Sequence, residues 1–307
     1  MIVGLHHVGR TVATLTRPAE QLAGLTGWPI EISDGATDPL VAGRQVARTA
    51  RAAGPNGWIE LVEVGGPAAR RREIHRSGVT HAAIQLPQID AAVERADAVG
   101  IERHPGPVDL GTGYRYLYVR DIEQLVIEIE GAPHAPIELD PWLSHGAIST
   151  PDLTRLRAAY EVLLTTEARA STRIRGVEAF DRGAMLDDVD VSVTWVPVVN
   201  GSVEMWQFHH PTTTPEAPVA YETPGAGHLA FETDDLDGAL DRSIAAGFAV
   251  VDEPVAGDGV AVARLRDPDA NWVELVTFDD EDDPRSLRRR PDLERPARMD
   301  ELFRSGR

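Results

Sequence analysis

The strongest constraint on the fold of this chain is a pattern that occurs four times along it. Each copy opens with a short apolar strand that carries a histidine and closes with an apolar strand that carries a glutamate, 46 to 59 residues later. A motif that recurs along a chain indicates a repeated structural unit. The histidines are His7, His81, His145 and His228, and the glutamates are Glu60, Glu128, Glu204 and Glu274.

A helical pattern follows each histidine strand. In the third copy a helix is expected to start after Pro151 and Asp152, because Leu153, Leu156 and Tyr160 recur at helical spacing. In the other copies Gly27, Gly100 and Gly247 stand where a helix would end in a left-handed residue. Each copy then reads as strand, helix and about three strands, so the sequence predicts an α+β protein built from four βαβββ modules.

The glutamates carry the chemical argument. Residues two apart on a strand share one face, so Glu60 lies on the face of Trp58 and Val62, and Glu274 on that of Trp272 and Val276. Burying an ionised carboxylate without a partner costs several kcal/mol or more, so a buried glutamate here requires a cation. The chain contains no cysteine, so any metal site has to use histidine and carboxylate ligands.

Length and charge limit the remaining possibilities. A chain of 307 residues allows two domains, and we expect them at 1–134 and 140–279, each with two modules. A charged tail at 280–307 is expected to be extended or disordered, with a short docking helix at Met299 to Phe303 as an alternative for part of it. A formal net charge of −19 disfavours nucleic acid as a partner. No apolar run is long enough to span a membrane, and the start of the chain resembles a strand, so we expect a cytoplasmic protein.

These motifs resemble those of the vicinal oxygen chelate superfamily, which includes glyoxalase I, methylmalonyl-CoA epimerase, bleomycin-resistance proteins and extradiol dioxygenases. The resemblance covers about residues 3–278 and rests on the histidine strands, the βαβββ period and the Asp-Pro-x-x-Asn-x-x-Glu ending at Asp267 to Glu274. It implies that two modules pair into a U-shaped half-barrel around one divalent metal. Neighbouring modules would then supply His7, Glu60, His81 and Glu128 in the N-terminal domain, and His145, Glu204, His228 and Glu274 in the C-terminal domain.

Two imidazoles and two carboxylates suit Fe2+, Mn2+, Ni2+, Co2+ or Zn2+, with positions left for water or substrate oxygens. Such an ion would offset the cost of burying the glutamates and polarise a substrate carbonyl, while a loosely held glutamate accepts a proton. The candidate catalytic groups are therefore Glu60, Glu128, Glu204 and Glu274. Two-domain ring-cleaving relatives keep the metal in the C-terminal pair, which favours His145, His228 and Glu274, but the N-terminal set also looks complete.

The resemblance implies three functions. The first is an isomerase, epimerase or lyase that acts on a small oxygenated metabolite through a metal-stabilised enolate, as a monomer or homodimer. The second is an Fe2+ extradiol dioxygenase, which is disfavoured because the strand Val260–Leu265 lacks a tyrosine and the stretch Val189–Val199 lacks a histidine. The third is a drug-binding resistance protein, which is disfavoured because all eight candidate ligands are present.

Overall fold

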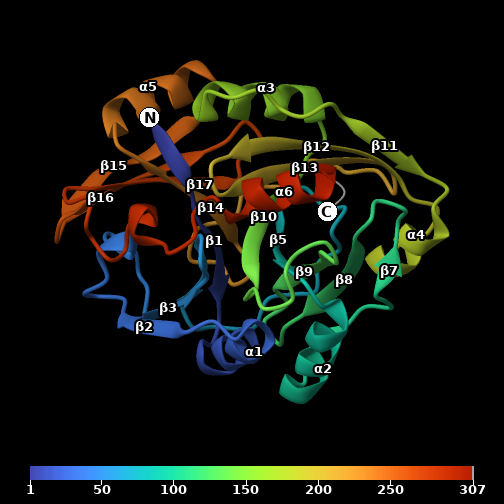
Figure 1. Cartoon of the computed structure of the whole chain (residues 1–307). Helices are drawn as coiled ribbons and strands as arrows, with labels where there is room; N and C mark the ends of the chain where they lie inside the picture. The colour runs from blue at the N-terminus through green and yellow to red at the C-terminus, as the bar shows by residue number, and fades with distance from the viewer. Residues whose placement is uncertain (306–307) are drawn as a thin grey trace.

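The computed structural model describes residues 1–305 and contains two large mixed β-sheets. In Figure 1 the sheets lie side by side, with helices α1 and α2 along one side of the molecule and α3 and α5 along the other. Helix α1 packs against α2, and helix α3 packs against α5. Among the described residues, no helix has the length and apolar character needed to cross a membrane.

The first sheet, called sheet A, has eight strands and is built from the first and last modules of the chain. Its strand order is β15-β16-β17-β14-β1-β4-β3-β2. The strands are β1 (Ile2–Val12), β2 (Ile30–Asp34), β3 (Arg48–Ala53), β4 (Trp58–Glu63), β14 (Gly227–Thr233), β15 (Ala249–Gly257), β16 (Val260–Arg266) and β17 (Trp272–Phe278).

The second sheet, called sheet B, has nine strands and is built from the two middle modules. Its order is β11-β12-β13-β10-β5-β9-β8-β6, and β7 pairs with β8. The strands are β5 (Gly78–Leu86), β6 (Glu102–Arg103), β7 (Val108–Asp109), β8 (Arg115–Arg120), β9 (Val126–Gly131), β10 (Trp142–Ser149), β11 (Thr172–Arg175), β12 (Asp190–Val198) and β13 (Gly201–His210).

The predicted βαβββ module is confirmed in all four copies. Within each module the first strand pairs in parallel with the last strand, which places the histidine strand beside the glutamate strand. Gly27 and Gly100 end their helices with positive φ, and Asp152 caps the third helix by accepting a hydrogen bond from Arg155 N. The module helices are α1 (Thr16–Thr26), α2 (Ile89–Val99), α3 (Leu153–Leu164) and α5 (Leu236–Ala245).

The partners of the modules differ from the expectation. β1 pairs antiparallel with β14, and β5 pairs antiparallel with β10, so the first module joins the fourth and the second joins the third. The prediction that neighbouring modules pair within 1–134 and within 140–279 is therefore wrong. The segments 64–77 and 211–226 carry the chain from one sheet to the other, whereas the proline-containing segment 132–141 connects two strands of sheet B. The domain boundaries at 134 and 140, which divide the sequence into two halves of two modules each, stay a prediction.

One hydrophobic core joins the two sheets and their four helices. Gly146 on β10 permits close packing of the sheets, because a Cβ atom there would lie 2.6 Å from Leu229 Cδ2 and 2.9 Å from Val8 Cγ2. Buried Asn56 and Asn200 connect the sheets, since the Asn56 side chain donates to Leu143 O and the Asn200 side chain donates to Leu5 O. The two sheets thus hold each other in place.

The tail is ordered rather than extended, which corrects the prediction for 280–307 within the described residues, whereas the docking helix expected at Met299 to Phe303 is present. Glu232, buried in sheet A, accepts hydrogen bonds from Ser286 and from Leu287 N at the start of the short helix η2 (Leu287–Arg289). The chain then forms α6 (Arg295–Ser305), whose Met299 packs on Trp142 at the start of β10. The tail therefore leads from sheet A to sheet B, as the position of α6 in Figure 1 shows.

Candidate metal centres

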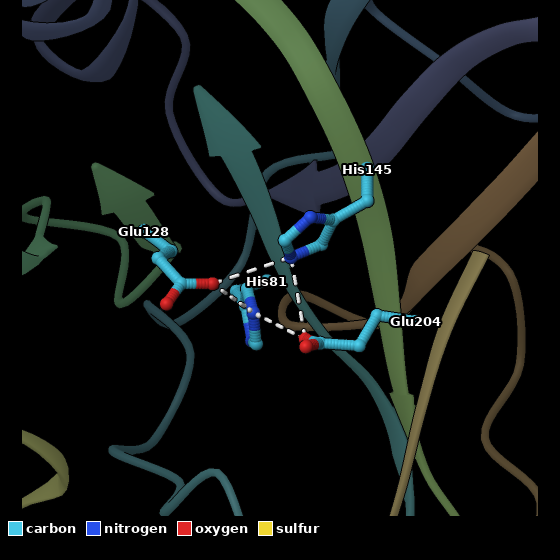
Figure 2. A group of neighbouring side chains, drawn as sticks. All are labelled: His81, Glu128, His145 and Glu204. Atoms are coloured by element: carbon cyan, nitrogen blue, oxygen red, sulfur yellow. Dashed lines mark hydrogen bonds and ion pairs between the residues drawn. The ribbon is translucent and has the colours of Figure 1, made fainter. Parts of the chain in front are cut away.

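The four side chains of the middle modules converge on one point inside sheet B (Figure 2). His81, Glu128, His145 and Glu204 come from β5, β9, β10 and β13, the four adjacent strands at the centre of the sheet. His145 Nε2 lies 3.2 Å from both Glu128 Oε2 and Glu204 Oε2. His81 Nε2 lies 3.1 Å from Glu128 Oε2 and 3.5 Å from Glu204 Oε2. We call these four residues quartet B.

Quartet B fits a divalent ion. All four residues are buried, and each offers one ligand atom within 4.8 Å of the others. Despite these contacts, the buried atoms His145 Nε2 and Glu204 Oε2 form no hydrogen bond among the described residues, which is costly unless a further group satisfies them. Burial acts to lower the pKa of His145, but Glu204 and Glu128 outweigh burial and raise it well above its usual range. These atoms therefore call for a cation at their centre.

A cavity of about 570 Å³ adjoins quartet B at His145. Its wall includes Tyr116 and Trp195 from sheet B, Tyr114 just before β8, and Pro296, Asp300 and Phe303 from α6. Glu130, two residues beyond Glu128 on β9, also lines the cavity, and its Oε2 is buried without a partner. Burial raises the pKa of Glu130 to about 7, helped by the nearby Glu128. The volume is within the range of small-molecule sites.

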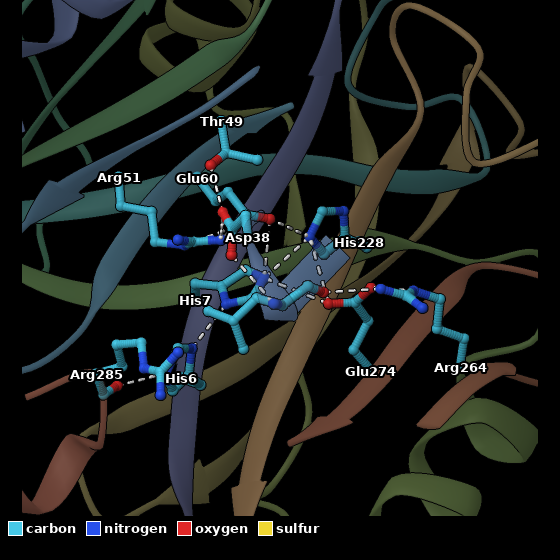
Figure 3. A network of polar contacts seen from close by, with 11 residues as sticks. His6, His7, Asp38, Thr49, Arg51, Glu60, His228, Arg264, Glu274 and Arg285 are labelled. Carbon is cyan, nitrogen blue, oxygen red and sulfur yellow. Dashed lines mark hydrogen bonds and ion pairs between the residues drawn. The ribbon is translucent and has the colours of Figure 1, made fainter. Parts of the chain in front are cut away.

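The outer modules bring together the other four residues, inside sheet A (Figure 3). His7 Nε2 lies 3.0 Å from His228 Nε2, 3.3 Å from Glu60 Oε2 and 3.6 Å from Glu274 Oε2. His228 Nε2 lies 3.2 Å from Glu60 Oε2. These residues, here called quartet A, are at most 1% exposed.

Quartet A differs from quartet B in its surroundings. Two buried arginines contact its carboxylates, because Arg51 Nε donates to Glu60 Oε1 over 2.8 Å and Arg264 Nε donates to Glu274 Oε1 over 2.8 Å. Burial acts to raise the pKa of Glu274, but Arg264 and the two histidines outweigh it and lower the pKa to about 2. The Tyr221 ring stacks on His228, with 5.2 Å between centroids. Both carboxylates of quartet A thus already have cationic partners.

His7 has a further contact through its neighbour. His6 is buried as well, because its ring stacks on Trp58 and its Nε2 contacts Arg285 O at 2.9 Å. His6 Nδ1 lies 2.7 Å from His7 Nδ1. Burial lowers the pKa of His6 to about 3, and the adjacent His7 acts in the same direction. His6 is therefore neutral and orients the His7 ring.

All eight predicted site residues are buried and gathered in two quartets, but the quartets do not follow the two halves of the sequence. His7 and Glu60 join His228 and Glu274, and the remaining four residues form the second set, because β1 pairs with β14 and β5 with β10. Sequence reasoning missed Arg51, Arg264 and Glu130. The arginines had a signal, since each faces its glutamate across a hairpin, nine or ten residues earlier in the chain.

Comparison with known proteins agrees with this geometry. Residues 5–129 and 144–264 each match a family model described as the Glyoxalase/Bleomycin resistance protein/Dioxygenase superfamily. Together these matches span most of the chain. The chain belongs to this superfamily. A search of curated proteins finds no match.

Solved structures support the same fold for this superfamily member. Glyoxalase I from Zea mays superimposes with a TM-score of 0.64 at 16% identity, covering 89% of this chain and 92% of that chain. A putative dioxygenase from Bacillus subtilis subsp. subtilis str. 168 superimposes with a TM-score of 0.57 at 15% identity, covering 91% and 86%. At these identities the likeness concerns the fold, so the reaction has to be argued from the site.

Proposed function

We propose that the chain is a divalent-metal-dependent isomerase, epimerase or lyase whose active centre is quartet B. The observation that carries this proposal is the pair of buried atoms His145 Nε2 and Glu204 Oε2, which lie 3.2 Å apart without forming a hydrogen bond, beside a cavity of about 570 Å³. His81, Glu128, His145 and Glu204 would hold the ion, which would be Fe2+, Mn2+, Ni2+, Co2+ or Zn2+ by its donor set. When bound, such an ion polarises a substrate carbonyl oxygen.

The carboxylates of quartet B are free to move a proton. Glu128 and Glu204 form ion pairs only with His81 and His145 among the described residues, so neither is fixed by an arginine. Glu204 Oε2 is buried and forms no hydrogen bond among the described residues, which makes Glu204 the better candidate for the proton acceptor at a carbon next to a carbonyl. Glu128 lies near the ring of Tyr118, and that ring packs edge-on against His81. The Tyr118 ring thus limits the movement of the Glu128 side chain.

The cavity indicates the kind of substrate. Tyr114, Tyr116, Trp195 and Phe303 supply an aromatic wall, while Glu130 offers an unpartnered carboxylate oxygen next to the quartet. We infer a small oxygenated metabolite with an apolar or aromatic part and a hydrogen-bond donor. Because α6 forms one wall, the end of the chain takes part in enclosing the substrate.

Metal analysis combined with turnover tests this proposal. Purified protein is loaded with each candidate ion, and small 2-oxo and 2-hydroxy compounds are screened by NMR in D2O for exchange of the proton next to the carbonyl. Exchange that disappears on chelation and in His145→Ala supports the proposal. Oxygen uptake by the iron-loaded protein with a catechol would instead indicate a dioxygenase. Tight binding of an organic ligand that survives chelation, without turnover, would indicate a binding protein.

A further inference from the structure

The residue that faces each glutamate across its hairpin differs between the two sheets. In sheet A the cross-strand partners are arginines, with Arg51 opposite Glu60 and Arg264 opposite Glu274. In sheet B the same positions hold aromatic residues, with Tyr118 opposite Glu128 and Trp195 opposite Glu204. Directly opposed residues of neighbouring strands point to the same face. Only the glutamates of quartet A therefore have a cation at this position.

The two arginines are built into the structure around quartet A. Arg264 is 1% exposed and donates from its three guanidinium nitrogens to Glu274 Oε1, Ala42 O and Leu40 O over 2.7 to 3.0 Å. Arg51 is held between Glu60 and Asp38, with 2.7 Å from Nη2 to Asp38 Oδ2. Figure 3 shows Arg51 and Arg264 approaching the quartet from opposite sides.

The loop 38–42, which contains the short helix η1 (Pro39–Val41), fills the space beside quartet A. Both arginines bind this loop, Arg51 at Asp38 and Arg264 at Leu40 and Ala42. Leu40 packs with Ala230, Val262 and Val276, and Val41 packs with Val62, Tyr221 and Trp272. Glu60 and Val62 share a face of β4, as do Glu274 and Val276 of β17, so the loop occupies the face that carries the quartet.

Formal charges separate the two quartets. Glu60, Glu274 and Asp38 carry three negative charges that Arg51 and Arg264 reduce to one, so a divalent ion would leave a buried excess of positive charge. Glu128 and Glu204 have no arginine in contact among the described residues, and Glu130 adds a third buried carboxyl nearby. A divalent ion would compensate charge at quartet B. Because a buried charge is stable only when it is compensated, the ion favours quartet B.

We infer that quartet A is a metal-free polar centre in which Arg51 and Arg264 replace the cation, so that the chain binds one divalent ion, at quartet B. This inference shares with the proposed function the binding of a metal at quartet B. It adds that quartet A joins the first module to the fourth, and that its two arginines fix the loop 38–42.

The test counts Co2+ bound per chain. The full-length protein and its variants are loaded with Co2+, desalted and analysed for metal content, with circular dichroism to verify folding. We expect one equivalent in the wild type, none in His81→Ala/His145→Ala, and one in His7→Ala/His228→Ala. Two equivalents in the wild type, or loss of the ion in the His7/His228 variant, would overturn the inference.

The arginines are tested directly by Arg51→Met/Arg264→Met, which is expected to gain a second equivalent and a second set of visible Co2+ absorption bands. The reciprocal change Tyr118→Arg is expected to lower Co2+ affinity at quartet B at least tenfold. A folded Met variant that stays at one equivalent overturns the role of the arginines. If the wild type binds no Co2+ but the Met variant gains one equivalent, the arginines do replace a cation at quartet A, whereas the ion at quartet B and the proposed function both fail. No Co2+ in either protein overturns the role of the arginines as well.

Discussion

Arg264 and Glu274 form a fully buried ion pair across the β16–β17 ladder, with 2.8 Å between Arg264 Nε and Glu274 Oε1 and both residues 1% exposed. The remaining guanidinium nitrogens of Arg264 bind the backbone of the loop 38–42. The pair therefore couples the last module to a loop of the first module.

Replacing Arg264 with methionine is expected to destabilise the protein, because the change leaves Glu274 buried without its arginine. Breaking one side of a buried pair costs about 3–5 kcal/mol. Urea unfolding of Arg264→Met measures the loss. The double variant Arg264→Met/Glu274→Gln removes both charges and should recover part of it; a double variant less stable than the sum of the single changes would contradict a direct coupling.

Replacing Glu204 with glutamine is expected to lower turnover by about 10²- to 10⁴-fold, because it removes the proposed proton acceptor. Steady-state kinetics on the substrate found by the exchange screen measures kcat, and metal analysis separates loss of the acceptor from loss of the ion. Glu20→Gln, at an exposed position on α1, is the control. Full turnover in Glu204→Gln with metal retained would assign proton transfer to another group.

The buried carboxyl group of Asp267 is expected to make the free energy of unfolding depend on pH. Burial raises the pKa of Asp267 to about 6, against the hydrogen bonds that its carboxylate accepts from Asn271. The folded protein therefore holds a proton more tightly than the unfolded chain, so this contribution is fully present below about pH 4 and is lost as the pH rises through about 6. A shift of about two pH units corresponds to about 3 kcal/mol.

The comparison of wild type with Asp267→Asn between pH 4 and pH 7 isolates this effect. As the pH rises, the wild type should lose stability relative to Asp267→Asn, which does not titrate at this position. Parallel stability curves would show that Asp267 does not titrate in this window.

Met299 tests whether α6 is docked as a wall of the cavity. It is 5% exposed and packs with Trp142, Ala132 and Ala135. Met299→Ala is expected to reduce the free energy of unfolding by about 2 kcal/mol, which is at the lower end for buried large-to-small substitutions. It should also increase binding of the dye ANS, because a loosened helix exposes apolar surface. Arg298→Ala, which removes an exposed ion pair with Asp292, should change stability by less than about 1 kcal/mol. Equal effects of the two changes would argue against a docked helix.

The recurring histidines and glutamates were sufficient to predict the module and the eight inward-facing residues. These residues could not predict which modules pair, because the four histidine strands have similar sequences and any two of them could pair through their free edges. The choice depends on packing across the sheets, such as Gly146 against Val8 and Leu229. Nor could they predict the ordered tail, whose attachment depends on a single buried carboxylate, Glu232.

The sequence was sufficient to name side chains that the structure brings together, but not the residues around them. The spacing from Arg51 to Glu60 and from Arg264 to Glu274 is that of a hairpin partner, so the arginines could have been found by reading each glutamate together with the residue nine or ten positions earlier. The cavity at His145 depends on where α6 comes to lie, which requires the three-dimensional structure.

The nested order of the modules has a consequence for synthesis on the ribosome. Sheet B uses only residues 78–210, so its strands can pair once the middle of the chain has emerged. β1 is made before the other strands of both sheets, yet its antiparallel partner β14 begins only at Gly227. An apolar strand with an open edge is prone to wrong pairing, and contacts distant in sequence form slowly. One edge of β1 can be covered early by β4, but its other edge stays open until the fourth module has been made, which makes that edge the exposed template for wrong pairing during synthesis.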